Sequence, residues 1–159
     1  MTQDELQEDV VNKALKFYSD NTKGYLDLAM RTGKTKITLE VIEKLFDSSF
    51  PQILILYPDN KLKENWENEC IKWKYSNPNI RYSNFSSLKK CNDQDYDAII
   101  CDEFHSLSNG EESTLKKLSS TIWLFLSGTI SKETKQKWPE FKEIYKFSTI
   151  QGIEYQILS

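Results

Sequence analysis

The sequence has few of the residues that mark specialised protein classes. Its 3 cysteines, Cys70, Cys91 and Cys101, lie far apart and form no CxxC pair. This spacing argues against a disulfide framework and a zinc cluster, and it favours buried thiols. No apolar run approaches the roughly 18 residues that a membrane-spanning helix requires, and the acidic N-terminus lacks the basic-then-apolar order of a secretory signal. We therefore expect a soluble protein of the cytoplasm.

Length and charge narrow the class further. The chain of 159 residues can form one domain with a sizeable core, but it is too short for two full-sized domains. Its formal net charge of −3 provides no polybasic surface for nucleic acid. We expect a single lobe over residues 1–159, with any nucleic-acid contact confined to a local part of its surface.

Short aliphatic runs alternate with helix-like segments along the chain. The pattern predicts strands at residues 25–29, 52–57, 80–85, 96–101 and 122–126. It predicts helices at residues 4–18, 37–46, 61–73 and 115–120, and a helical tail at 131–147 in which Pro139 starts a new helix. Uniformly apolar strands are typical of a parallel sheet between two layers of helices, a three-layer α/β/α fold. Such sheets bind ligands at the carboxyl ends of their strands.

The first candidate site follows the strand at 25–29 and opens the next helix. Its residues are Met30, Arg31, Thr32, Gly33, Lys34 and Thr35. Backbone N–H groups at such a turn bind phosphate oxygens, while Lys34 can reach the β and γ phosphates of ATP and Thr35 can ligate Mg²⁺. Leu28 stands where the strict pattern has its leading glycine. Because a Gly-Lys-Thr triplet also occurs at helix starts that bind nothing, a partner motif is required.

That partner is a pair of carboxylates, Asp102 and Glu103, after the strand at 96–101. Asp102 would hold Mg²⁺ through water, and Glu103 would orient and activate the water that attacks the γ phosphate. Taken alone, such a pair is more often a solvated turn. With a phosphate loop about 70 residues upstream in an α/β chain, it predicts a site for ATP and Mg²⁺.

Two further motifs complete a family resemblance. His105, the only histidine, follows the carboxylate pair, and Ser127, Gly128 and Thr129 follow the strand at 122–126. Asp102–His105 resembles the DExH box of superfamily 2 helicases, so the chain resembles the RecA-like N-terminal lobe of these P-loop NTPases. The resemblance implies that the hydroxyls of Ser127 and Thr129 bond to the DExH loop and couple hydrolysis to movement. In isolation, Ser-Gly-Thr would be a polar turn.

A third segment resembles motif Ia of the Swi/Snf-like branch. The apolar strand at 52–57 and Pro58 precede a helix that carries Asn65-Trp66. The resemblance implies that the turn and helix start lie near phosphates of the tracked DNA strand. The residues concerned are Asp59, Asn60 and Lys61. Residues 82–88 resemble a second backbone contact of the family.

The helix at 61–73 also has an apolar face. We expect its inward residues to be Leu62, Trp66, Cys70 and Trp73. Because the two tryptophans share this face, we expect both to be core residues rather than platforms for base stacking.

Gln7 stands where the family often has a glutamine that reads adenine, although the usual arginine and aromatic neighbours are absent. The alternative is an exposed helical glutamine. The resemblance spans residues 6–157. Residues 145–158 resemble the stretch where relatives leave the first lobe. It implies a second RecA-like lobe, in the same or another chain, that supplies an arginine finger. We therefore expect little ATPase activity from this chain alone.

Together these patterns predict the ATP-binding lobe of an ATP-dependent DNA helicase or translocase. The partner would be a single strand or one strand of a duplex, DNA rather than RNA, and a phage source would place the protein in the host cytoplasm. A small-molecule kinase would need an acceptor pocket and a lid, whereas the strand ends here carry helicase-like motifs. The sequence leaves open a non-enzymatic one-lobe module that binds a partner helicase or DNA.

Overall fold

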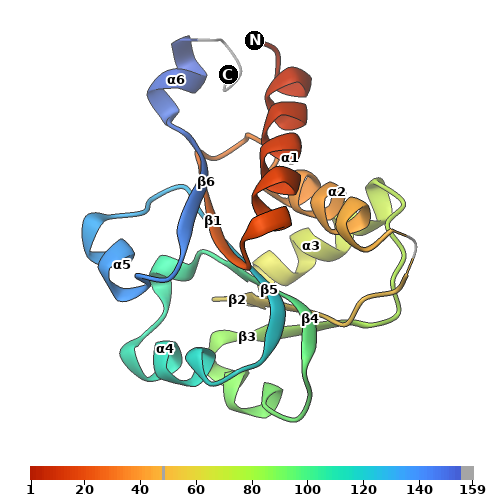
Figure 1. Ribbon diagram of the computed structural model, residues 1–159, viewed down its shortest axis with the longest axis vertical. Helices are drawn as coiled ribbons and strands as arrows, with labels where there is room; N and C mark the ends of the chain where they lie inside the picture. The colour runs from red at the N-terminus through yellow and green to blue at the C-terminus, as the bar shows by residue number, and fades with distance from the viewer. Residues whose placement is uncertain (48, 155–159) are drawn as a thin grey trace.

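A parallel β-sheet forms the centre of the protein. The computed structural model describes residues 1–47 and 49–154, and within them six strands pair side by side in the order β3-β2-β4-β5-β1-β6 (Figure 1). The strands are β1 (Lys23–Leu28), β2 (Ile53–Tyr57), β3 (Ile80–Asn84), β4 (Tyr96–Asp102), β5 (Ser120–Ser127) and β6 (Lys142–Phe147). Every pair is parallel, so all carboxyl ends share one edge of the sheet.

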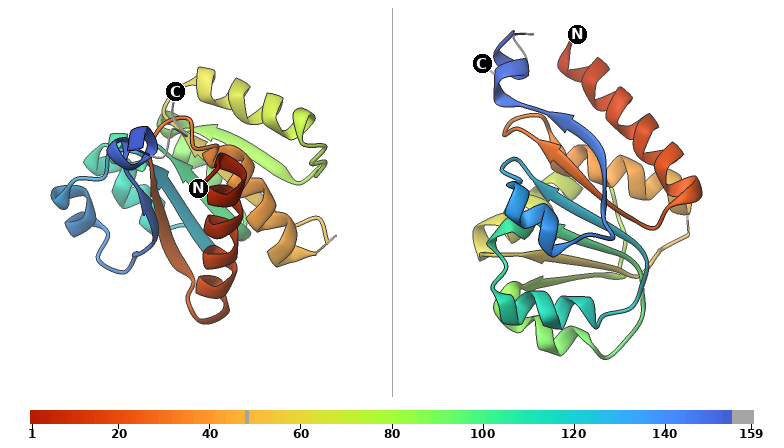
Figure 2. Two further views of the ribbon diagram at one scale, coloured as in Figure 1. Left: turned by 90° about the horizontal axis from the view of Figure 1, so that it is seen from above. Right: turned by 60° about the vertical axis from the view of Figure 1, so that its left-hand side comes forward.

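Helices cover both faces of this sheet. They are α1 (Gln3–Asp20), α2 (Lys34–Phe46), α3 (Asn60–Lys72), α4 (Asn109–Lys116), α5 (Lys132–Lys137) and α6 (Thr149–Glu154), with 3₁₀ turns η1 (Phe85–Cys91) and η2 (Phe104–Ser106). Figure 2 shows α1, α2 and α3 on one face and α4 and α5 on the other. The predicted three-layer α/β/α architecture is confirmed. Among the described residues, no helix combines the length and apolarity needed to cross a membrane.

Alternation along the strands creates two hydrophobic clusters, one under each helical layer. The first joins alternate strand residues to Leu6 of α1, Ile37 of α2 and Trp66 of α3. The second joins the other strand residues to Phe104 of η2 and Leu115 of α4. The central strands are therefore buried on both sides, which explains their apolar runs at residues 53–57, 98–101 and 122–126.

The helical tail predicted for residues 131–147 is wrong. Only Lys132–Lys137 is helical, and Lys142–Phe147 forms β6, which pairs with β1 at the edge of the sheet. Pro139 lies in the turn between them and starts no helix. Trp138 and Phe141 flank this turn, and both rings pack against Phe125 of β5. This packing ends the helix. An edge strand tolerates alternating charged side chains, and this pattern is hard to distinguish from an exposed helix.

The helix predicted at 115–120 is also misplaced. It begins six residues earlier, at Asn109, and ends at Lys116, while Ser120 already belongs to β5. The start is set by a capping box, in which the Ser108 side chain accepts from the Glu111 N–H and the Glu111 side chain accepts from the Ser108 N–H. The Ser-x-x-Glu signal was therefore present in the sequence.

Two expectations about burial need correction. Trp73 is 42% exposed, because it caps α3 after the last helical residue, Lys72, instead of continuing the inward face. Its ring lies under the Lys36 ammonium, whose Nζ is 4.4 Å from the ring centroid. Cys91 and Cys101 are buried thiols as expected, but Cys70 is only partly buried. Of residues 145–158, those beyond Glu154 lie outside the described residues.

Candidate nucleotide-binding site

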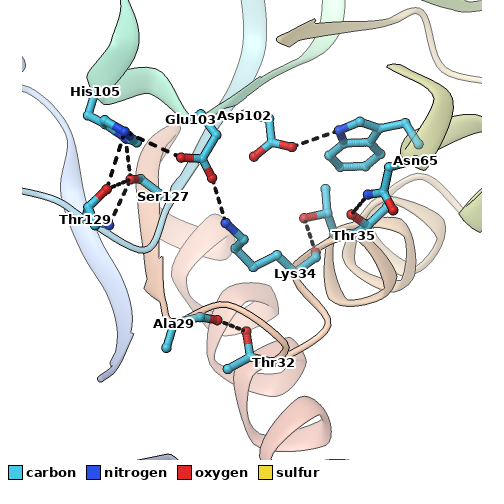
Figure 3. Close-up of polar contacts among 12 residues, drawn as sticks. Ala29, Thr32, Lys34, Thr35, Asn65, Asp102, Glu103, His105, Ser127 and Thr129 are labelled. Atoms are coloured by element: carbon cyan, nitrogen blue, oxygen red, sulfur yellow. Dashed lines mark hydrogen bonds and ion pairs between the residues drawn. The ribbon is translucent and has the colours of Figure 1, made fainter. Parts of the chain in front are cut away.

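The loop between β1 and α2 has the backbone shape of a phosphate-binding turn. Gly33 caps α2 in the left-handed region, at φ 87°, and Arg31 is also left-handed, at φ 69°. The Thr32 hydroxyl donates to the Ala29 carbonyl at 2.8 Å, which closes the turn (Figure 3). The left-handed backbone favours glycine here, and a Cβ on Gly33 would lie 2.3 Å from Nε2 of Gln7, so the Gln7 amide would have to move from its bond to the loop.

Helix α1 holds this loop from one side. Nε2 of Gln3 donates to the Arg31 carbonyl at 2.9 Å, and Nε2 of Gln7 donates to the Thr32 carbonyl at 3.0 Å. Oε1 of Gln7 accepts from Nζ of Lys36 at 3.0 Å. Gln7 is only 6% exposed, so the alternative of an exposed glutamine is wrong. Its adenine-reading role stays a prediction.

The phosphate loop faces the two predicted carboxylates. Nζ of Lys34 lies 3.0 Å from Oε1 of Glu103, and the two side chains point toward each other from opposite sides of the site (Figure 3). Glu103 has a left-handed backbone, at φ 54°. Non-glycine residues adopt this region at a cost and concentrate at functional sites when they do. The pair brings together residues 69 positions apart, as the motifs predicted.

Asp102 has one occupied and one open carboxylate oxygen. Nε1 of Trp66 donates to Oδ2 at 3.0 Å. Oδ1 is the one fully buried side-chain polar atom in the described residues without a hydrogen-bond partner. Burial raises the pKa of Asp102 above its ordinary value, opposed by the Lys34 ammonium and the bond from Trp66. A buried oxygen of this kind calls for a ligand.

These residues fit a magnesium ion. The open Oδ1 of Asp102 and the hydroxyl of Thr35 are both oxygen donors, which Mg²⁺ prefers. Nδ2 of Asn65 donates to Oγ1 of Thr35 at 3.3 Å and leaves that hydroxyl a second lone pair. No cluster of three or more His, Cys, Asp or Glu side chains suits a metal within the described residues. Mg²⁺ in nucleotide sites commonly takes its remaining ligands from water and phosphate.

The DExH loop is joined to the Ser-Gly-Thr motif by side-chain hydrogen bonds. His105 lies between them, with Nδ1 2.7 Å from Oγ of Ser127 and Nε2 3.3 Å from Oγ1 of Thr129. Nε2 also lies 3.5 Å from Oε2 of Glu103. Oγ of Ser127 also accepts the Thr129 N–H at 3.1 Å, so this one hydroxyl contacts both the histidine and the turn of the Ser-Gly-Thr motif. The predicted bonds are present, and their role in coupling stays a prediction.

Gly128 lets the Ser-Gly-Thr motif approach the phosphate loop. A Cβ on this residue would lie 2.8 Å from the Leu28 carbonyl oxygen, a backbone atom at the end of β1. β1 and β5 pair directly up to Asp27 and Ser127, so the two loops leave the sheet side by side. Close backbone approach is the physical reason for glycine at this position.

Not every predicted site residue joins this cluster. Met30 is 77% exposed on the outside of the phosphate loop. Asp59, Asn60 and Lys61 lie at the start of α3, at the same edge of the sheet. The Asp59 carboxylate accepts the N–H groups of Lys61 and Leu62, so these amides already have an anionic partner. A DNA phosphate here would rely on the side chains of Asn60 and Lys61.

Sequence reasoning missed two residues that touch the site. Asn65 and Trp66 were interpreted as part of a DNA-binding helix and its core face, yet they bond to Thr35 and Asp102. The available signal was a polar amide directly before a buried indole, whose N–H needs an acceptor. Their partners lie 30 and 36 positions away in sequence, so the pairing required the fold.

The fold and the site together define a RecA-like lobe of the superfamily 2 helicase type. Residues 1–132 match the family described as "Type III restriction enzyme, res subunit", and the chain belongs to this family. A comparison with curated protein sequences finds no significant match.

Several solved structures share this fold. A nuclease-deletion mutant of the type ISP restriction-modification enzyme LlaGI, in complex with a DNA substrate mimic, is 16% identical with a TM-score of 0.74, covering 96% of this chain and 20% of that chain. The Sulfolobus solfataricus SWI2/SNF2 ATPase core in complex with dsDNA is 20% identical with a TM-score of 0.68. The match covers 85% of this chain and 34% of that chain. The UvsW helicase from bacteriophage T4 is 16% identical with a TM-score of 0.68. The match covers 87% of this chain and 58% of that chain. The chain thus spans between about a fifth and three-fifths of the length of these structures.

Proposed function

We propose that this chain is the ATP-binding lobe of an ATP-dependent DNA helicase or translocase, with Mg-ATP bound between the phosphate loop and the DExH loop. The observation that carries the proposal is the pairing of Lys34 with Glu103 beside the open Oδ1 of Asp102. A cation, a carboxylate base and an unpaired metal-binding oxygen are three of the elements that phosphoryl transfer to water uses. All three lie at the carboxyl edge of the sheet, where ligands of such folds bind.

Each side chain has a distinct role in this proposal. Lys34 exchanges its contact with Glu103 for the β and γ phosphates when nucleotide binds. The released Glu103 carboxylate then orients the attacking water and accepts its proton. Thr35 and Asp102 hold Mg²⁺, which when bound neutralises charge on the phosphate oxygens. When Glu103 changes its partner, the contact between Glu103 and His105 changes as well. His105 then alters its hydrogen bonds to Ser127 and Thr129.

The active form requires a second RecA-like lobe. In this proposal residues 1–159 supply one wall of the ATP site, and the second lobe, in the same or another chain, supplies the arginine finger. Such a residue is worth roughly 10³–10⁵ in rate in related NTPases. The isolated chain therefore binds nucleotide and hydrolyses it slowly.

DNA is the proposed track. Two of the structures with this fold are described as complexes with a DNA substrate mimic and with dsDNA, which supports DNA as the partner here. The start of α3, at Asn60 and Lys61, is the proposed contact with one strand. With a net charge of −3, the contact is local and the affinity of this chain alone is low. Membership of the Swi/Snf-like branch stays a prediction.

The test is nucleotide binding and turnover with Mg²⁺, with and without single- and double-stranded DNA. The chain is compared with Lys34→Ala and Glu103→Gln. We expect Lys34→Ala to abolish binding, Glu103→Gln to retain binding and lose the residual turnover, and DNA to stimulate turnover only when the second lobe is present. Unchanged nucleotide affinity in Lys34→Ala would contradict the ATP site. Brisk, DNA-stimulated turnover by the chain alone would contradict the requirement for a second lobe.

A further inference from the structure

Two consecutive residues of α3 bond to the two proposed metal-binding side chains. Asn65 donates to Oγ1 of Thr35, at the start of α2, over 3.3 Å. Trp66 donates to Oδ2 of Asp102, at the end of β4, over 3.0 Å. Figure 3 shows the Asn65 amide directed at Thr35 from the side of the site opposite His105. One helix therefore contacts both halves of the metal site.

The bond from Trp66 determines which oxygen of Asp102 is free. Trp66 has no exposed surface and its ring is packed in the cluster between the sheet and the helices. A buried indole N–H must find an acceptor, since an unpaired one costs roughly 1–3 kcal/mol, and its position is fixed by the packing of the ring. Oδ2 of Asp102 meets this donor, and Oδ1 remains open. The tryptophan thus orients the carboxylate.

Asn65 acts in a similar way on the hydroxyl. Its amide occupies one lone pair of Oγ1 of Thr35, so the other lone pair has a defined direction. Thr35 is 9% exposed and lies in the first turn of α2, directly after Lys34. Donors that fix the orientation of metal ligands commonly change metal affinity about 10- to 100-fold when they are removed.

We propose that Asn65 and Trp66 are positioning residues, through which α3 orients Thr35 and Asp102 to bind the Mg²⁺ of the nucleotide. The inference rests on the proposed ATP site. It assigns these residues a role in the strength of the metal contact rather than in the grip on the nucleotide, which Lys34 provides. Removing either bond therefore weakens the effect of Mg²⁺ on nucleotide binding and leaves metal-free binding intact.

The experiment measures the affinity of a fluorescent ADP analogue as Mg²⁺ is titrated. Trp66→Phe keeps an aromatic ring in the core and removes only the N–H donor, and Asn65→Ala removes the amide. Trp73→Phe is the matched control, because Trp73 is near the end of the same helix and donates to a different carboxylate, Glu69. Thermal unfolding of each variant establishes that it is folded.

We expect each site variant to need at least about tenfold more Mg²⁺ for the same gain in affinity, with metal-free affinity within about twofold of the parent chain. Trp73→Phe should behave as the parent chain does. A parent-like Mg²⁺ requirement in both site variants overturns the inference while leaving the ATP site intact. If the parent chain shows no nucleotide binding that Lys34→Ala abolishes, the proposed function and the inference both fail.

A second measurement covers the case in which Trp66→Phe does not fold. In the ¹⁵N-labelled parent chain, Mg²⁺ added to the nucleotide-bound state should shift the Trp66 indole resonance, because the metal draws charge from the Asp102 carboxylate. The Trp73 indole resonance should stay in place. An unmoved Trp66 resonance at saturating Mg²⁺ overturns the inference.

Discussion

Nδ1 of His105, in η2, lies 2.7 Å from Oγ of Ser127, the last residue of β5, although the two residues are 22 positions apart. Ser127 has no exposed surface, and its hydroxyl also accepts the Thr129 N–H at 3.1 Å. One buried hydroxyl therefore holds together the histidine of the DExH loop and the turn of the Ser-Gly-Thr motif. Both the stability of this region and the position of His105 depend on it.

Replacing this hydroxyl tests its contribution to stability. Ser127→Ala should lower the free energy of unfolding by about 1–3 kcal/mol, because the Thr129 N–H and Nδ1 of His105 both lose the buried hydroxyl that they share. Ser113→Ala, at an exposed position in α4, is the control and should change stability by less than about 0.5 kcal/mol. Urea unfolding measures both. Equal changes in unfolding free energy for the two variants would mean that the Ser127 hydroxyl contributes no more to stability than an exposed hydroxyl does.

The central strands and the site loops were readable from the sequence for a physical reason. A strand segment buried on both faces is apolar, as residues 98–101 of β4 and 122–126 of β5 are, and the polar residues Asp102 and Ser127 end the two strands. Because parallel strands end at one edge, the motifs had to converge. The contacts of Asn65 and Trp66 were not readable, since they depend on how α3 packs beside β4.

The close backbone neighbour of Gly128 gives a steric prediction. Gly128→Ala should cost about 1–3 kcal/mol of unfolding free energy, because its Cβ would lie 2.8 Å from the Leu28 carbonyl oxygen, which cannot rotate away. Gly110→Ala, in α4, has no atom within 4 Å of the new Cβ and should stabilise the chain by about 0.5–1 kcal/mol. Thermal or urea unfolding compares them. Stabilisation by both substitutions would show that the loops separate freely.

The errors in the sequence interpretation fall outside the buried central strands of the sheet. β6 carries charged residues because one side of an edge strand lies open, so its pattern fits a helix equally well. Trp73 was assigned to the core because it continued the helical spacing of Trp66, but α3 ends at Lys72. Helical spacing predicts which residues face the core only for residues that are inside the helix. The residue at which the helix ends depends on tertiary packing.

A buried carboxylate on β1 predicts a pH effect on stability. Asp27 is 8% exposed, and burial raises its pKa above the ordinary 3.8, although the ammonium groups of Lys146 and Lys135 oppose the shift. The folded state thus favours the protonated form, and the stability this contributes is lost as pH rises through the raised pKa. An asparagine side chain at this position would stay neutral at every pH. Asp27→Asn should therefore gain stability relative to the parent chain as pH rises.

Urea unfolding at about pH 3.5 and about pH 7 measures this change in the stability difference. Asp20→Asn, at the exposed end of α1, controls for the removal of one negative charge from the chain. A stability difference for Asp27→Asn that is constant or shrinks with rising pH would contradict the raised pKa.

The turn after α3 offers a stabilising substitution. The Tyr75 N–H donates to the Cys70 carbonyl at 2.9 Å and the Lys74 N–H donates to the Ile71 carbonyl at 3.2 Å, the bonding pattern of a Schellman motif. This motif needs a left-handed residue, and Lys74 has φ 55°. The lysine side chain is exposed, so its loss removes no core packing.

Lys74→Gly should raise the free energy of unfolding by about 0.5–1 kcal/mol, because glycine relieves the left-handed strain by more than it adds to the entropy of the unfolded chain. Lys44→Gly makes the same exchange at an exposed helical position in α2 and should lower stability by about 1 kcal/mol. Opposite signs for these two substitutions, measured by thermal unfolding, would establish that backbone conformation decides the outcome. If Lys74→Gly destabilises the chain as Lys44→Gly does, Lys74 is not strained and α3 ends differently from the geometry described.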